Sequence, residues 1–341
     1  MARKYIDRNI YFDERKKHYI VTLYFGLDEK GHTIRKMESY TLLKDARAAL
    51  RAHESGRDNG LVVAPAKKTL SEWLNYWLKN IVVPKVESTT LYGYLHIINN
   101  HINPNLGHLD MQSIRPIIIQ KYYTKLLQET KLSPNTVIKH HHLLTTAFKA
   151  AVKQEVLIKS PMDGVEPPRK INKEASVYNI EQLQELLKKV EGDERLETMV
   201  KICAYLGLRR GEACGLKWDD IDFESRTLTV RETRTMAGSD VIIKEPKTSS
   251  SIRKLHISDG LYDALQKELN RQQKNKNFFG MDYVETDYVL VNANGETMRP
   301  NHLSEAFASF IKKMACPRCG FMNCGIPLHP CQMRQVYLNS T

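Results

Sequence analysis

The sequence lacks the features that mark membrane and secreted proteins. No apolar run reaches the roughly 20 residues that a membrane-spanning helix needs. The segment Met1–Arg8 has no apolar core of the kind found in signal peptides. We therefore expect a cytoplasmic protein with no membrane partner. Internal repeats and low-complexity segments are also absent from the sequence.

Cysteine is scarce over most of the chain. Only Cys203 and Cys214 occur in the first 300 residues, and both stand among apolar residues at helical spacing. We expect them to be reduced core residues rather than a disulfide pair. The other four cysteines crowd the tail; they are Cys316, Cys319, Cys324 and Cys331.

Basic residues outnumber acidic ones. The 341 residues include 51 Lys and Arg against 39 Asp and Glu, which gives a formal charge of +12. Such an excess suits a polyanionic partner, above all nucleic acid, although a merely basic globular protein has the same balance. The length predicts two or three domains with cores that need no disulfides.

The first 60 residues alternate as strands do and then become helical. His18–Phe25 is rich in β-branched and aromatic residues, Asp28–Gly31 favours a hairpin turn, and Ile34–Leu42 can return as a partner strand. Lys44–Arg51 has helical spacing. We predict a small three-stranded sheet with one helix, followed by a linker over Gly56–Lys68, which is rich in Gly and charge.

A helical region is predicted from about residue 69 to about residue 160. Thr69 and Glu72 have the spacing of a capping box. Breaks at Pro84, at 103–107 and at Ser133–Pro134 predict about four helices. Five residues at helical spacing should face a core: Leu70, Trp73, Leu74, Trp77 and Leu78.

Two helix starts in this region carry groups that suit DNA phosphates. The first offers Ser88, Thr89 and Tyr92, and the second offers Asn135, Thr136 and Lys139. Backbone amides and the helix dipole at such starts favour phosphate, although capping alone explains the same residue types. The run 140–142 is three histidines, which we interpret as a solvated or DNA-facing stretch rather than a metal site, because adjacent positions point to different sides of a helix.

The last part of the chain alternates between helical and strand patterns. A second linker, stiffened by three prolines, is predicted over Ile158–Arg169. From about residue 172 the pattern predicts four helices and three strands. The helices cover 180–190, 196–206, 261–272 and 301–313, and the strands cover 227–230, 241–243 and 253–257.

The segment Gly207–Asp222 reads GLRRGEACGLKWDDID. It resembles the first arginine box of the tyrosine recombinases, the phage-type integrases. The resemblance implies that Arg209 is the first catalytic arginine, which grips the scissile phosphate. Glu212 would orient its guanidinium, and Arg210 is the weaker candidate because it should point elsewhere. Taken by itself, Arg-x-x-Glu would be an exposed ion pair at a helix start.

A second landmark of that family is a lysine on the following hairpin, which Lys247 matches. In the family this lysine is the general acid that protonates the leaving 5′ oxygen, and a tyrosine forms a 3′-phosphotyrosyl link. The resemblance implies a multidomain α/β chain that binds double-stranded DNA and recombines it for a phage or mobile element. It also implies a tetramer on DNA in intact relatives, and neither cofactor nor metal.

The resemblance implies three domains. Residues 1–62 would be an arm-type DNA-binding β-β-β-α domain, and 66–165 a helical, SAM-like core-binding domain. Residues 172–341 would be the mixed α/β catalytic domain, incomplete after about 313.

The tail departs from the family pattern, which requires a His-x-x-Arg box and a distant tyrosine. His329 has no arginine three places later, Arg334 is displaced, and Tyr337, the only later tyrosine, stands too close. We therefore expect the chain as written to be unable to recombine DNA, for lack of the second arginine, the histidine and the tyrosine.

A shift of reading frame would explain this departure. One back-translation of Phe321–His329, read one base earlier, contains His-Glu-Leu-Arg-His, and its Glu and Leu follow from any codons for 322–324. We place the predicted frameshift near Lys313. Two alternatives remain: a non-catalytic DNA-binding remnant, and a zinc-containing DNA-binding regulator whose Cys-x-x-Cys begins at Cys316.

Overall fold

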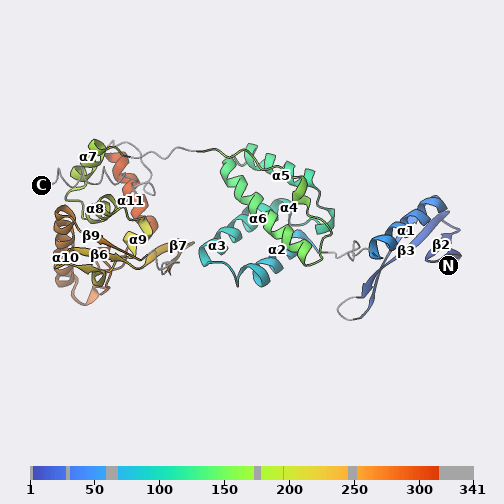
Figure 1. Cartoon of the computed structure of the whole chain (residues 1–341), viewed down its shortest axis with the longest axis horizontal. Coiled ribbons are helices and arrows are strands. Elements are labelled where there is room, and N and C mark those ends of the chain that lie inside the picture. Colours follow the sequence, from blue (N-terminus) through green and yellow to red (C-terminus); the bar gives the residue numbers. More distant parts are fainter. Residues whose placement is uncertain are drawn as a thin grey trace. The chain divides into compact units, whose positions relative to one another are not determined.

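The structure is a computed structural model that describes residues 3–27, 31–58, 68–172, 178–194, 196–244 and 252–314. By its internal contacts the chain divides into two compact units, residues 1–172 and 173–341. Figure 1 labels helices and strands of both units. Buried apolar side chains form three separate clusters: one in the N-terminal sheet, one among the helices from residue 70 to 165, and one in the second unit. The two cysteines predicted to be reduced core residues are buried, and neither forms a disulfide within the described ranges, as expected.

The N-terminal part is an antiparallel sheet in the order β1-β2-β3-β4, with one strand more than predicted. Its elements are β1 (Arg3–Asp7), β2 (Ile10–Asp13), β3 (His18–Leu27), β4 (Thr33–Tyr40) and α1 (Leu43–Asp58). Ala46 and Leu50 on α1 pack with Val21 and Leu23 on β3. The tight turn between the two short strands is made by Asn9 at φ 61°, a conformation that Asn tolerates and that strand periodicity does not reveal.

The helical part of the first unit contains α2 (Leu70–Trp77), α3 (Ser88–Ile97), α4 (Asn103–Leu106), α5 (Pro116–Gln128) and α6 (Pro134–Lys153). The predicted capping box is present, since Thr69 N donates to Glu72 Oε2 at 2.8 Å and Glu72 N donates to Thr69 Oγ1 at 3.3 Å. All five residues predicted to face a core are buried. Turns of 3-10 helix lie at η3 (Met111–Ser113) and η4 (Pro161–Gly164).

We predicted a break in the helix at 103–107, but the chain stays helical over most of this range and the helix ends only where the range ends. The chain continues from α3 through a π-helical turn, η2 (Ile98–Ile102), into α4. Asn103 N donates to Ile98 O, five residues back, one residue before Pro104. Proline lacks an N–H and crowds the carbonyl four residues earlier, so the wider turn accommodates it without ending the helix. A second π-helical turn, η1 (Leu78–Val82), closes α2 before Pro84.

The predicted second linker is partly wrong, because half of it belongs to the helical core. Pro161, Met162 and Val165 are buried, and the first of these prolines begins the short helix η4. The three prolines suggested a stiff spacer. However, Pro161, Met162 and Val165 are apolar, and apolar side chains in a turn can pack on the core of the domain that the turn follows.

The second unit has two small antiparallel sheets and five α-helices among its described residues. The strands are β5 (Ile221–Asp222), β6 (Thr227–Val230), β7 (Thr233–Ala237), β8 (Asp240–Lys244) and β9 (Arg253–His256). The helices are α7 (Ile180–Val190), α8 (Glu197–Leu206), α9 (Arg210–Cys214), α10 (Asp259–Phe279) and α11 (Pro300–Lys313), and η5 (Trp218–Asp220) and η7 (Gly280–Asp282) are 3-10 turns. The order in the larger sheet is β5-β6-β9, and β7 pairs with β8.

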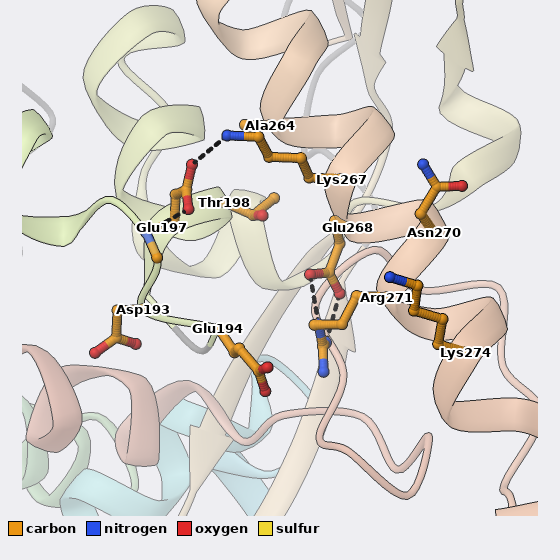
Figure 2. Close-up of a pocket in the computed structure, with 11 residues that line it drawn as sticks. Asp193, Glu194, Glu197, Thr198, Ala264, Lys267, Glu268, Asn270, Arg271 and Lys274 are labelled. Atoms are coloured by element: carbon orange, nitrogen blue, oxygen red, sulfur yellow. Dashed lines mark hydrogen bonds and ion pairs between the residues drawn. The ribbon is translucent and has the colours of Figure 1, made fainter. Parts of the chain in front are cut away.

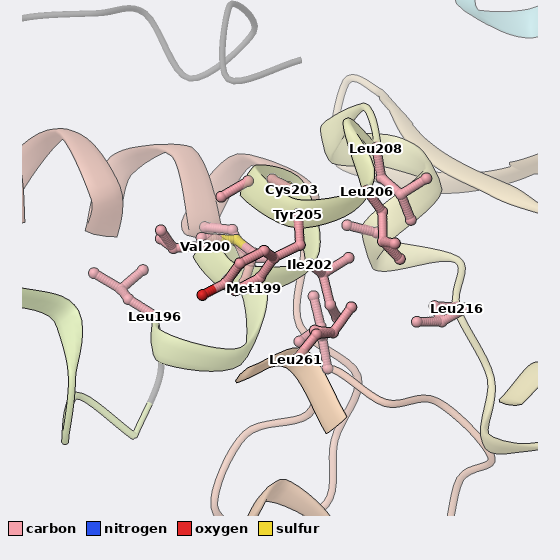
Figure 3. Close-up of a cluster of buried hydrophobic side chains, with 14 of the residues drawn as sticks. Leu196, Met199, Val200, Ile202, Cys203, Tyr205, Leu206, Leu208, Leu216 and Leu261 are labelled. Atoms are coloured by element: carbon pink, nitrogen blue, oxygen red, sulfur yellow. The ribbon is translucent and has the colours of Figure 1, made fainter. Parts of the chain in front are cut away.

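Helix α8 is the centre of this core. Every residue from Thr198 to Leu206 is buried. Figure 3 shows its side chains with Leu208, Leu216 and Leu261 around them. A helix that is buried on all sides is held on all sides, and its end therefore provides a fixed base for the residues after it. It ends at Gly207, whose φ of 62° is the left-handed C-cap that glycine adopts without strain.

Candidate active site

Arg209 stands at the start of α9, directly after the buried Leu208. It is the N-cap residue of that helix, with extended backbone angles, so its side chain leaves the core instead of joining it. The Arg209 side chain is 81% exposed. The structure thus presents a permanently charged guanidinium from a rigid base, which is the arrangement that phosphate recognition requires.

The side chain of Glu212 contacts this arginine and is only 8% exposed. Its carboxylate accepts four hydrogen bonds. Arg209 N donates to Oε2 at 2.8 Å and an Arg209 terminal nitrogen donates to Oε1 at 3.1 Å. Arg253 donates to the same two oxygens, at 3.2 Å to Oε1 and 2.7 Å to Oε2. The orienting contact expected of Glu212 is therefore present, and it is shared between two arginines.

Arg253 is the residue that sequence reasoning missed. It opens β9, and its side chain is 33% exposed. The signal was the alternation of the strand: Arg253 and Leu255 are partly buried, while Lys254 and His256 are exposed. An arginine on the inward face of a strand needs a buried partner, and Glu212 is the carboxylate that meets it.

The electrostatics of Glu212 are set by this arrangement. Burial alone would raise the pKa of the carboxyl, but the hydrogen bonds from Arg253 and Arg209 and the charge of Arg253 outweigh it and hold the pKa below its usual value. The carboxylate stays ionised, so the cluster of two guanidiniums and one carboxylate keeps a net positive charge.

Two glycines let α9 lie directly on the neighbouring strand. A Cβ at Gly211 would stand 2.8 Å from the backbone oxygen of Arg234 on β7, and a Cβ at Gly215 would stand 2.7 Å from the backbone oxygen of Glu232. The start of α9, which carries Arg209, is therefore held from two sides. Helix α8 precedes it directly in the chain, and β7 is in close backbone contact with α9.

The other residues expected in the catalytic domain fall in different places. A terminal nitrogen of Arg210 donates to Ser304 Oγ on α11 at 2.6 Å, so this arginine points away from Arg209 and Glu212. Lys247 lies outside the described residues, in the segment between β8 and β9. His329, Arg334 and Tyr337 also lie outside them, as do the four tail cysteines and the stretch 321–329 on which the frameshift prediction depends.

Of the two helix starts expected to contact DNA, the first has side chains that are accessible to solvent. Ser88 is exposed at the first position of α3, Thr89 comes next, and Tyr92 is 47% exposed with its ring stacked on His96. Lys139, from the second start, is exposed on α6. These side chains are positioned to reach a ligand.

At the second start, Asn135 and Thr136 make contacts within the protein. Asn135 Nδ2 donates to Ile171 O at 2.7 Å, and Ile171 N donates to Asn135 Oδ1 at 3.0 Å. Both ends of this amide bond the protein's own backbone, and the contact of Asn135 with DNA stays a prediction. The Thr136 hydroxyl lies 2.9 Å from Ser133 Oγ, and Ser133 Oγ accepts from Thr136 N as the helix cap.

The histidine run is only in part the solvated stretch that we predicted, because His142 is exposed and His141 is half-buried while His140 is not accessible. His140 is fully buried, and its Nδ1 lies 2.9 Å from Tyr122 Oη. Burial, with the charges of His101 and His96, lowers the pKa of His140 to about 4. Tyr123 Oη contacts His141 Nδ1 at 3.2 Å. Helical periodicity sends the first of the three inward, on the same face as Val137 and Leu144.

A cavity of about 400 Å³ lies elsewhere in the second unit, between α8 and α10. Figure 2 shows two ion pairs among its charged side chains: Arg271 is 2.6 Å from Glu268, and Lys267 is 3.7 Å from Glu197. None of the Arg209 cluster lines it. We therefore assign it no part in the chemistry. Among the described ranges, no group of three or more His, Cys, Asp or Glu side chains could hold a metal ion.

Comparison with known proteins gives this geometry its context. Residues 69–127 match the family model of the phage integrase N-terminal SAM-like domain, and residues 177–321 match that of the phage integrase family. A "Tyrosine recombinase XerC-like" protein of Caldanaerobacter subterraneus subsp. tengcongensis is 31% identical over 329 residues, which cover 90% of this chain and 83% of that protein. The chain belongs to the tyrosine recombinase family.

Several integrases match more distantly. The ICEBs1 integrase of Bacillus subtilis is 28% identical over 57% of this chain and 53% of its own length. The Tn1549 transposon integrase in complex with transposon right end DNA has a TM-score of 0.64 at 19% identity, over 80% of this chain and 86% of that one. A lambda integrase tetramer bound to a Holliday junction has a TM-score of 0.57 at 17% identity, over 98% and 92%.

These likenesses show the recombinase fold, a helical SAM-like domain and a mixed α/β catalytic domain. They favour the recombinase interpretation over the zinc regulator and the non-catalytic remnant. No helix in the described parts of the chain has the length and apolar content to cross a membrane.

Proposed function

We propose that this chain binds double-stranded DNA and holds one scissile phosphodiester at Arg209, in site-specific recombination for a phage or another mobile element. The observation that carries the proposal is the Arg209–Glu212–Arg253 cluster. Two fixed guanidiniums share one buried carboxylate, which leaves a net charge of about +1 opposite the single negative charge of a phosphodiester. Arg209 offers the exposed edge.

In this proposal the second unit is the catalytic domain and Arg209 stabilises the charge that develops on the equatorial oxygens. Arg253 acts through Glu212, as a positioning residue. Lys247 would protonate the 5′ oxygen as it leaves, by its match to the family pattern. We assign no nucleophile, since Tyr337 does not stand where the family pattern requires a tyrosine.

The helical domain, proposed as residues 66–165, would supply further phosphate contacts through Ser88, Thr89, Tyr92 and Lys139. The N-terminal sheet and α1, within residues 1–62, would be the arm-type DNA-binding domain. Assembly on DNA as a tetramer would parallel the lambda integrase tetramer on its Holliday junction. With a DNA substrate of this kind, the chain would act in the cytoplasm.

A gel-shift series on a 40-base-pair duplex tests the phosphate contact. The logarithm of the affinity falls linearly with the logarithm of the salt concentration, and each lost phosphate contact makes this slope shallower by about 1. We expect Arg209→Ala to reduce the slope by about that amount. Arg210→Ala is the matched control, because its side chain contacts Ser304. Equal slopes for wild type and Arg209→Ala would remove Arg209 from the phosphate site.

Covalent chemistry is tested on a nicked suicide substrate, with adducts separated on a denaturing gel. The frameshift hypothesis predicts that this chain forms no adduct, since its tail lacks the expected box. An adduct that disappears in Tyr337→Phe would contradict that hypothesis and assign Tyr337 as the nucleophile.

A further inference from the structure

The segment that leaves the helical domain is held against it at two points. Gln120 Nε2 donates to Glu166 O at 3.3 Å and Glu166 N donates to Gln120 Oε1 at 3.2 Å. Asn135 makes the same double contact with Ile171, at 2.7 and 3.0 Å. We call residues 166–171 the strap. Two amide side chains, from α5 and α6, each pair with the N–H and the C=O of one strap residue.

The sequence of the strap suits this docking. Val165, just before it, is buried in the helical core, and Gly164 lies close to Pro116 at the start of α5. Pro167 and Pro168 stand between the two clamped residues. Prolines have no N–H to leave unpaired and restrict the backbone to extended forms, so two clamps suffice to align the strap.

The clamps change the length of chain that connects the two units. With the strap docked, six residues (172–177) separate Ile171 from Tyr178, the first described residue of the second unit. With the strap released, twelve residues (166–177) separate Val165 from Tyr178. The division of the chain at Asn172 agrees with a strap that belongs to the first unit.

We propose that Gln120 and Asn135 are positioning residues that dock this strap and thereby set the reach between the two DNA-binding units. The inference rests on the proposed function for its effect on DNA, but not for the docking itself. Once one unit is on DNA, the effective concentration of the other falls roughly as the −3/2 power of tether length. Doubling the tether from six to twelve residues lowers it about threefold.

Docking is tested first, without DNA, by limited trypsin digestion of the full chain. Arg169 and Lys170 lie within the strap, and a protease needs the backbone around them to open. We expect Gln120→Ala/Asn135→Ala to be cut there several-fold faster than wild type, relative to cuts within α6. Gln128→Ala, an exposed amide on the same helix as Gln120, should match wild type. Equal rates in wild type and the double variant would overturn the docking.

Reach is tested by the affinity of the full chain for a 40-base-pair duplex of random sequence. The double variant should bind about threefold more weakly. A six-residue Gly-Ser insertion after Asn172, with the strap intact, should weaken binding to the same extent, because it gives a tether of the same length. A loss much larger than the insertion causes would indicate a direct DNA contact at Asn135 and overturn the positioning role, as would no loss at all. Failure of wild type to bind the duplex would refute the proposed function and leave the trypsin result to decide the docking.

Discussion

At the scale of single residues, the Glu212 carboxylate is held more firmly from β9 than from its own helix. Arg253 is one-third exposed, whereas Arg209 is mostly in solvent, which weakens any ion pair it makes. In a double-mutant cycle read by urea unfolding, Glu212→Gln with Arg253→Gln should give a coupling energy of about 1–3 kcal/mol. The cycle with Arg209→Gln should give under about 1 kcal/mol. The reverse order would show that Arg209, not Arg253, secures the carboxylate.

His140 is a second residue whose environment has a measurable consequence. Its pKa is lowered from 6.5 to about 4 by burial, so the unfolded chain binds a proton before the folded one does as the pH falls. Stability from this group is full above about pH 6.5 and is lost as the pH falls toward 4, by about 3 kcal/mol in all. His101 and His141, whose pKa values are also lowered by burial, act in the same direction.

Urea unfolding between pH 4.5 and 7 checks this prediction. Trp73 and Trp77 are both buried in the helical core, so their fluorescence in a Trp218→Phe background reports that core. His140→Asn, which keeps a polar atom near Tyr122 but does not titrate, should flatten the pH profile. His108→Asn, at an exposed position outside the histidine run, should leave it unchanged. A profile that stays steep in His140→Asn would assign the pH dependence to other groups.

At the scale of secondary-structure elements, the contact between α9 and β7 depends on the absence of a side chain. In Gly211→Ala the new Cβ would meet the backbone of Arg234 at 2.8 Å, and a strand backbone cannot move aside alone. We expect a loss of about 1–3 kcal/mol in unfolding free energy, the usual effect of overpacking. Gly93→Ala on α3, where nothing lies within 4 Å, should be neutral or stabilising. Equal stability of both variants would mean that α9 shifts freely.

The elements also show how far local sequence patterns reach. Thr69 with Glu72 and the apolar spacing after it predicted α2 correctly, because caps and periodicity are local properties. Helix α7 was predicted with the bounds that the structure has, 180–190, for the same reason. Strands β5 and β7 were missed, because β5 has only two residues and β7 (TRTMA) lacks the β-branched apolar residues that mark a strand. The direction of His140, the role of Arg253 and the second helix start depended on tertiary contacts that no local pattern contains.

At the scale of the whole molecule, three separate apolar clusters imply parts that are stable by themselves. The helical cluster, from Leu70 to Val165, closes on its own side chains and buries Trp73, Trp77 and Phe148. A fragment of residues 68–172 should therefore unfold in one cooperative transition, and its amide hydrogens in α6 should be protected from exchange. A fragment 68–160, which lacks Pro161, Met162 and Val165, should be less stable by about 2 kcal/mol or more. Equal stability would mean that η4 is not part of the core.

The burial of α8 on every side determines how the proposed phosphate site at Arg209 loses its DNA binding when the protein is denatured. Arg209 is attached to the most deeply packed helix of its domain, only two residues beyond the left-handed Gly207. A site on a mobile loop would lose its ligand gradually as denaturant is added, well before the domain unfolds. Here, site and core are one cooperative unit, so Arg209-dependent DNA binding should persist up to the unfolding transition of the second unit and vanish with it.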